Sequence, residues 1–265
     1  MRRLALGAAC VALSFASACS KKEPVKASHL AGPRVPESML QGKLRTRFDS
    51  PNPTAAQLAR KQRSLAIVKE MNLPWLDSLP VIEDETAIKA RTTTGVSTRC
   101  LATAFTAIKG ESNDQKLVDG FIQKFSARSF FSPQELDFLD NARPSREQLT
   151  DFSWRYECVH VFLWALGFLP RLNPPNQQCV VKDDIGIILD RGPERFAADA
   201  KLRPLAEILD QADLYYRLHW AADEFRLKEQ KSSIIDGEIT SERLRALNWL
   251  IRYQNQSWDD VSTDT

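Results

Sequence analysis

Apolar residues recur at helical spacing through most of this 265-residue chain, and that periodicity limits the folds it can adopt. Between residues 54 and 253 the apolar side chains return every three or four positions, which places them on one face of an α-helix. Capping boxes at Ser132 and Ser145 mark two helix starts. Only the short apolar segment 179–181 suggests a strand. The sequence therefore predicts an all-α fold, with one compact domain of several helices.

Prolines, glycines and capping residues bound the expected helices. We interpret Gly110 as the end of the second helix, and the capping box at Ser145 as the start of a helix that continues to about Gly167. Segments 72–92 and 170–178 contain prolines and are expected to be irregular. The other expected helices cover approximately residues 54–71, 94–109, 117–125, 184–190, 204–228 and 238–253, with a further helix beginning at Ser132.

The balance of charge excludes one class of partner. The chain has 36 lysines and arginines against 34 aspartates and glutamates. Without its first 18 residues it loses Arg2 and Arg3, and the two totals become equal. A protein that binds nucleic acid needs a basic excess to neutralise the phosphates. We therefore expect no nucleic-acid partner.

The first 19 residues have the organisation of an export signal. Two arginines precede an apolar run, residues 4–15, which is too short to cross a bilayer as a helix, and small residues then lead to Cys19. This arrangement resembles the lipobox of bacterial lipoproteins. The resemblance implies cleavage before Cys19, acylation of its thiol, and anchoring in the bacterial cell envelope through that lipid. The alternative is ordinary signal cleavage, which would leave Cys19 as a free thiol.

The residues after the cysteine indicate a location and a tether. Ser20 stands where lipoproteins retained at the inner membrane often have aspartate, so the resemblance favours the outer membrane, with the protein facing the periplasm. Residues 20–52 contain four prolines, two glycines and scattered charges, a composition typical of a flexible segment. The sequence thus predicts a signal peptide over residues 1–18, a lipid-anchored disordered tether over 19–52, and a helical domain over 53–265.

Three cysteines remain after Cys19, namely Cys100, Cys158 and Cys179. Cys100 and Cys158 lie within helical patterns and are interpreted as small core residues. One disulfide could form after export, and because the number is odd at least one of the three would stay unpaired within the chain. The sequence does not determine which cysteines would pair.

Several short motifs in the second half resemble, in order and spacing, a bacterial family named domain of unknown function 4272. The resemblance covers residues 61–265 and is clearest from Trp154 onward. It implies a fold but no catalytic residues, because the family has no established activity. The motifs are Trp154-Arg155-Tyr156-Glu157, Trp164-Ala165-Leu166-Gly167, Glu207-Ile208-Leu209-Asp210, Asp213 with Tyr216-Arg217, His219-Trp220, Glu242-Arg243, Asn248-Trp249-Leu250, Trp258-Asp259-Asp260 and Asp264-Thr265.

Charged residues fall on apolar helix faces at several positions, and a buried charge is tolerated only with a partner. We therefore expect a shared polar cluster that includes at least one contact between an arginine and a carboxylate on different helices. Replacing Glu157 with glutamine should then destabilise the protein. The candidate cluster consists of Arg155, Glu157, Asp213, Arg217, His219, Glu242 and Arg243.

Each polar position has a structural and a functional interpretation. His219 is either a core histidine with one hydrogen bond or a general base oriented by Asp223 or Asp213. The C-terminal aspartates Asp259, Asp260 and Asp264 either bind a hard cation or form a solvated segment that pairs with Arg245 or Arg252 while Trp258 packs. We expect no cofactor and no metal.

Motifs of nucleophilic, metal-dependent and phosphate-binding enzymes are absent from the sequence. The favoured function is therefore a non-enzymatic envelope lipoprotein that binds a protein or a small molecule. The alternative is a hydrolase-like enzyme that uses a buried Glu/Arg/His cluster. An open pocket shared by Glu157, His219 and Arg243 would favour the enzyme, whereas closed ion pairs in a solid core would favour binding.

Overall fold

The computed structural model describes residues 52–265, and the regular structure of this part is entirely helical, which confirms the predicted all-α fold. The segment 179–181 is no strand, because it contains the end of a loop and the first residue of a helix. The signal peptide, Cys19 and residues 20–51 of the expected tether lie outside the described residues. The helices are α1 (Ala55–Glu70), α2 (Thr93–Ser112), α3 (Gln115–Lys124), α4 (Pro133–Asp140), α5 (Arg146–Trp154), α6 (Tyr156–Ala165), α7 (Val181–Asp199), α8 (Leu205–Leu227) and α9 (Gly237–Leu250), with short 3-10 helices at Glu85–Ala87, Ala127–Phe130 and Tyr253–Asn255.

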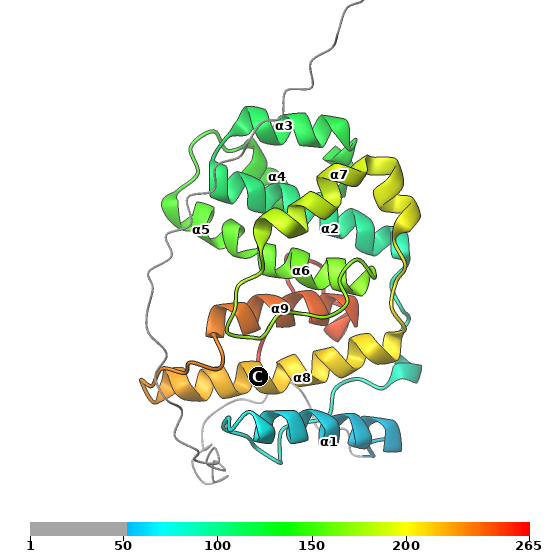
Figure 1. The fold of residues 1–265 in the computed structure, drawn as a ribbon, viewed down its shortest axis with the longest axis vertical. Coiled ribbons are helices and arrows are strands. Elements are labelled where there is room, and N and C mark those ends of the chain that lie inside the picture. Colours follow the sequence, from blue (N-terminus) through cyan, green and yellow to red (C-terminus); the bar gives the residue numbers. More distant parts are fainter. Residues whose placement is uncertain (1–51) are drawn as a thin grey trace, which may run out of the picture. The chain divides into compact units, whose positions relative to one another are not determined.

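Five helices pack in succession: α2 on α6, α6 on α9, α9 on α8, and α8 on α1 (Figure 1). All described residues belong to one compact unit. Every residue of α6 is buried, as expected for a helix that is apolar on all sides. Its Phe162 contacts the rings of Trp249 and Trp258, at centroid distances of 5.6 and 5.7 Å. The helix α6 is therefore the centre of the core. None of the helices in residues 52–265 is long and apolar enough to cross a bilayer.

The helix predicted from Ser145 to Gly167 is in fact two helices, α5 and α6, which meet at Arg155. The backbone N–H of Arg155 donates to Phe152 O at 3.2 Å, a tight turn that changes the direction of the chain. The two halves have different surroundings, because α5 has no fully buried residue and α6 has no exposed one. The break lets α5 pack on α2 while α6 enters the core.

The interpretation of Gly110 as a helix end is wrong. The helix α2 continues to Ser112 and ends at Asn113, whose φ of 49° is left-handed. Gly110 instead lies where α5 crosses α2. A Cβ atom at this position would come within 2.6 Å of Ser153 N and 2.8 Å of Leu149 O. The glycine is needed because the backbones of two helices approach closely.

Replacing Gly110 with alanine is expected to destabilise the protein by about 1–3 kcal/mol, because the added Cβ must push the α5 backbone away from α2. Urea unfolding would measure the loss. Gly120→Ala on α3 is the matched control, since a Cβ at Gly120 would meet nothing within 4 Å. Equal stability of the two variants would contradict this account of Gly110.

The helix expected over residues 184–190 is longer than predicted, because α7 continues through a kink to Asp199. The kink lies at Gly192, which has φ 69° and ψ 176° and precedes Pro193. Proline is well suited to the first turn of a helix, so the Gly-Pro pair that suggests a helix end also begins the second half of α7. That half places the buried Phe196 against Phe168, with ring centroids 4.9 Å apart.

Candidate functional site

A proline-rich loop, residues 170–179, connects α6 to α7 and is the element on which the buried polar groups converge (hereafter the 170–179 loop). A loop without regular structure leaves its backbone N–H and C=O groups in need of other partners. In this loop many of those partners are side chains that come from the helices of the core. The polar network therefore has to be described together with the loop.

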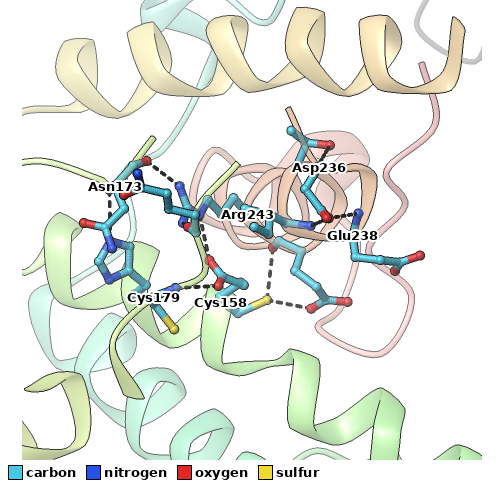
Figure 2. A network of polar contacts seen from close by, with 12 residues as sticks. Cys158, Asn173, Cys179, Asp236, Glu238 and Arg243 are labelled. Carbon is cyan, nitrogen blue, oxygen red and sulfur yellow. Dashed lines mark hydrogen bonds and ion pairs between the residues drawn. The ribbon is translucent and has the colours of Figure 1, made fainter. Parts of the chain in front are cut away.

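Arg243, on α9, is fully buried and donates four hydrogen bonds. Its Nε atom donates to Glu157 Oε2 at 2.8 Å, and its Nη1 atom donates to Tyr215 Oη at 2.8 Å. Two further bonds reach the loop, to Asn173 O at 2.6 Å and to Gln177 O at 3.0 Å. Figure 2 shows Arg243 and Asn173 within this network. One guanidinium thus connects α6, α8, α9 and the 170–179 loop.

Glu157, the partner of Arg243, completes the attachment of the loop. Its Oε1 atom accepts a hydrogen bond from the backbone N–H of Cys179 at 2.7 Å, and its Oε2 atom accepts from Arg243. Both carboxylate oxygens therefore have donors inside the protein. A buried charge that is paired and hydrogen-bonded in this way is stable where an isolated one would not be.

His160 forms a second buried attachment that the sequence reasoning missed. Its Nδ1 atom lies 2.8 Å from Asp184 Oδ2 on α7, and its Nε2 atom accepts from the backbone N–H of Asn173 at 3.2 Å. Because Nε2 accepts a hydrogen bond, the Nδ1–H group is the donor in the hydrogen bond to the Asp184 carboxylate. The signal that could have revealed His160 is its position on a helix that is apolar on every face apart from Glu157.

Arg155, at the junction of α5 and α6, and Glu242 form the second ion pair among the candidate residues. Arg155 Nη1 lies 2.8 Å from both carboxylate oxygens of Glu242 on α9. The thiol of Cys158 also donates to Glu242, at 3.1 Å from both Oε2 and the backbone oxygen. Burial and the Glu242 carboxylate raise the pKa of Cys158 well above its ordinary value. The thiol therefore stays protonated and is a poor nucleophile.

Among the seven candidates, the expected arginine–carboxylate contact between distant elements is present twice, as Arg243–Glu157 and Arg155–Glu242, but the seven residues do not form one cluster. Asp213 and Arg217 lie four residues apart on α8 and pair with each other, with Arg217 Nη2 2.9 Å from Asp213 Oδ1. Arg217 also donates to Pro80 O at 3.2 Å. This pair fixes the irregular segment before α2 against α8.

His219 lies apart from these three ion pairs, at the edge of a hollow of about 400 Å³ between the end of α8 and the start of α9. Its Nδ1 atom is 3.4 Å from Thr240 Oγ1, and its Nε2 atom is 4.0 Å from Asp223 Oδ2. Burial lowers the pKa of His219 from its ordinary value of 6.5, while the nearby Asp223 carboxylate acts in the opposite direction.

We expect the His219 imidazole to titrate below pH 6.5 in the folded protein. The unfolded chain then binds more protons than the folded chain between the two pKa values, so stability should fall as the pH drops below about 6.5 and level off below the folded pKa. A titration of the ring protons by NMR measures the midpoint, and His219→Asn should remove this part of the pH dependence. A midpoint above 6.5 would contradict the burial effect.

A groove of about 810 Å³ is bounded by α1, α8 and the 170–179 loop (hereafter the α1–α8 groove). Asn173 and Tyr215 line it, and both are hydrogen-bonded to Arg243 from behind. The buried network therefore fixes one wall of this groove. This groove could not be predicted from the sequence, because one of its walls is a loop whose position depends on the packed core.

Glu157 faces a different and smaller hollow of about 310 Å³, which is also lined by Cys179 and Tyr156. The phenol of Tyr156 donates to Glu111 there, at 2.7 Å. Glu157 thus borders this hollow, His219 borders another, and Arg243 is enclosed by its own hydrogen bonds. Glu157 and Arg243 are paired, but none of the three hollows is lined by Glu157, His219 and Arg243 together, as a shared catalytic pocket would require.

The three cysteines of the described residues are not bridged: Cys100, Cys158 and Cys179 are buried free thiols.

The residues of the C-terminal segment contact other parts of the domain. Trp258 is buried as expected, and its indole N–H donates to Glu135 at 3.0 Å. Asp259 Oδ2 accepts from the backbone N–H of Gln134 at 3.1 Å. Within residues 52–265 no group of three or more metal-ligating side chains is present, so the cation interpretation of the C-terminal aspartates has no support in this structure.

These features define a class: an all-α domain in which buried ion pairs hold a proline-rich loop beside a groove. A family model described as a domain of unknown function, DUF4272, matches residues 60–261. The chain belongs to that family, and the resemblance recognised from its motifs is confirmed. No curated protein and no solved structure gives a match.

Proposed function

We propose that this protein is a lipid-anchored component of the bacterial cell envelope that acts by binding a ligand in the α1–α8 groove. The binding role is supported by the groups to which the buried Glu157–Arg243 pair is hydrogen-bonded. Glu157 and Arg243 direct their hydrogen bonds to each other, to Tyr215 and to the backbone of the 170–179 loop. Groups used in this way position a groove wall and present no reactive atom to a substrate.

The hydrolase-like alternative is less well supported. It needs a carboxylate, an arginine and a histidine at one cavity, but Glu157 and His219 border separate hollows and Arg243 borders neither. The binding role needs a concave surface of suitable size, and about 810 Å³ lies within the range of roughly 300–1,000 Å³ typical of ligand sites. A binding module is therefore the better proposal.

A photo-crosslinking experiment tests the binding role in the native envelope. Ile67 lines the groove and is 40% exposed, whereas Leu58 on the same helix is 44% exposed and lies outside the groove. Benzoylphenylalanine at position 67 should give a discrete covalent adduct on irradiation, and the same residue at position 58 should not. Absence of a specific adduct at position 67 would overturn the binding role.

The anchoring part of the proposal rests on the export signal and on Cys19. Cys19→Ala is expected to move most of the protein from the membrane fraction to the soluble fraction and to abolish labelling with a radioactive fatty acid. Cys179→Ala is the matched control, because that thiol is buried in the helical domain. Fatty-acid labelling that persists in Cys19→Ala would show that the anchor lies elsewhere.

A further inference from the structure

The charges of the α1–α8 groove leave one cation unpaired. Four charged side chains line the groove: Arg171, Arg203, Glu207 and Asp210. Glu207 pairs with Arg203 at 3.0 Å. Asp210 pairs with two arginines of α1, the nearer at 2.6 Å. Among the described residues Arg171 has no hydrogen bond and no ion pair, and it is exposed on the loop wall. A ligand with one negative charge would complement this lining.

Arg203 has little capacity to bind the same ligand, because its donors are already in use. Its Nε atom donates to Trp164 O at 2.8 Å, and its Nη2 atom donates to Leu169 O at 2.9 Å. With its ion pair to Glu207, this guanidinium holds the start of the 170–179 loop in place. Arg171 is therefore the side chain of the lining that is free to bind an anion.

Uncharged polar groups of the groove suit a peptide backbone. The lining contains three side-chain amides, from Asn173, Gln177 and Gln211. None of these amides bonds to another described residue; the hydrogen bonds of Asn173 and Gln177 involve their backbone atoms only. A carboxamide carries both a donor and an acceptor, as a peptide group does. Three free carboxamides in one groove therefore match the alternating N–H and C=O groups of an extended chain.

The other side of the groove is apolar. Ile67 on α1 is 40% exposed, and it lines the groove together with the half-buried Leu214 and the buried Leu218 on α8. Covering the exposed parts of Ile67 and Leu214 is favourable by about 25 cal/mol for each Å² of apolar surface removed from water. The groove thus offers apolar contact, carboxamides and one unpaired cation.

We propose that the α1–α8 groove binds a short extended peptide with a free C-terminal carboxylate: the carboxylate on Arg171, the backbone on the three carboxamides, and apolar side chains on the α1–α8 face. The proposal deepens the binding role above and rests on it. A fatty acid would leave the carboxamides without partners, and a peptide with a blocked C-terminus would leave Arg171 without one.

The test compares two peptide pools with the full-length protein in detergent, using saturation-transfer difference NMR, which detects weak binding to large particles. Both pools are N-acetylated tripeptides of alanine, valine, leucine and phenylalanine, and they differ only in a free carboxylate or a carboxamide at the C-terminus. We expect the acid pool to bind about tenfold more tightly, because a charge-assisted hydrogen bond to Arg171 contributes about 1.4 kcal/mol.

The controls assign the preference to one residue. Arg171→Gln should bind both pools equally, and Arg195→Gln, an exposed arginine of α7 outside the groove, should keep the tenfold preference. Three results would each overturn the proposal. The native protein could bind both pools equally, it could show saturation transfer to neither pool, or Arg171→Gln could keep the preference for the acid pool. Displacement of the acid pool by dodecanoate alone, with no preference between the pools, would assign the groove to fatty acids. A specific crosslink at position 67 without acid preference leaves the binding role standing and removes only the ligand class.

Discussion

Replacing Arg243 with methionine is expected to lower the free energy of unfolding by about 3–5 kcal/mol, the usual cost of breaking a buried ion pair by removing one partner. The substitution leaves the Glu157 carboxylate buried beside Tyr215 without its cation. It also leaves Asn173 O and Gln177 O without donors. Urea unfolding followed by circular dichroism would measure the loss.

A second measurement separates local from global effects of Arg243→Met. Hydrogen exchange at the amides of Cys179 and Asn173 should accelerate more than exchange in α6, because these amides belong to the loop that Arg243 holds. The double variant Glu157→Gln, Arg243→Met should lose less stability than the sum of the single variants, since glutamine removes the unpaired charge. Arg195→Met, at an exposed site, is the control and should change stability by less than about 0.5 kcal/mol. An unchanged free energy in Arg243→Met would show that the pair is replaceable.

Local sequence determined the parts of the fold that could be predicted. The capping boxes at Ser132 and Ser145 are present, because each depends on two side chains three residues apart. Gly110 was misread because its role depends on a second helix, α5, that crosses α2. The break at Arg155 likewise follows from the different burial of α5 and α6, which appears only when the chain is packed.

The candidate site was predictable only as a set of residues that need partners. Helical spacing indicates that Glu157 and Arg243 are buried, but it does not say that they meet each other, because they are 86 residues apart. The attachment of the 170–179 loop could not be predicted from the sequence, because it uses backbone atoms such as Asn173 O and Cys179 N. The α1–α8 groove depends on that loop position, so sequence reasoning could not place it either.

The buried network and the groove are two aspects of one arrangement. A proline-rich loop has too few internal hydrogen bonds to hold its own shape, so its conformation depends on the side chains behind it. The side chains of Arg243, His160 and Glu157 bind its backbone from the core. At the start of α9, the backbone N–H of Asp236 donates to Pro175 O at 2.9 Å. A rigid wall reduces the entropy lost when a ligand binds. The cost of burying these charges is therefore consistent with a need for a preformed groove.

Replacing Lys109, which lies remote from the groove, is expected to cause a second large loss of stability. This lysine of α2 is buried, and its Nζ atom lies 2.9 Å from Phe138 O, 2.8 Å from Leu139 O and 2.9 Å from Asn141 O. The last carbonyls of a helix have no partner within it, so Lys109 satisfies the C-terminal end of α4 and places a positive charge at the negative end of its dipole. Lys109→Met keeps the apolar stem and removes every donor. We expect a loss of about 3 kcal/mol, since Leu139 O and Asn141 O would lose their donor at about 1–3 kcal/mol each, and Phe138 O would keep only the N–H of Asn141, at 3.3 Å.

One effect opposes the stabilisation by Lys109: its ammonium group loses its hydration when it is buried. Burial lowers the pKa of Lys109, which means that the charged form is costly to bury, while Asp119 and Asp140 favour it. The three carbonyls and Gln115 Oε1, at 2.7 Å, should outweigh that cost, because together they surround the ammonium with acceptors. The thermal unfolding of Lys109→Met shows whether the hydrogen bonds or the desolvation cost is larger. Lys116→Met is the control, because Lys116 is an exposed lysine of α3. A melting temperature that rises in Lys109→Met would show that desolvation dominates and that α4 ends equally well without the lysine.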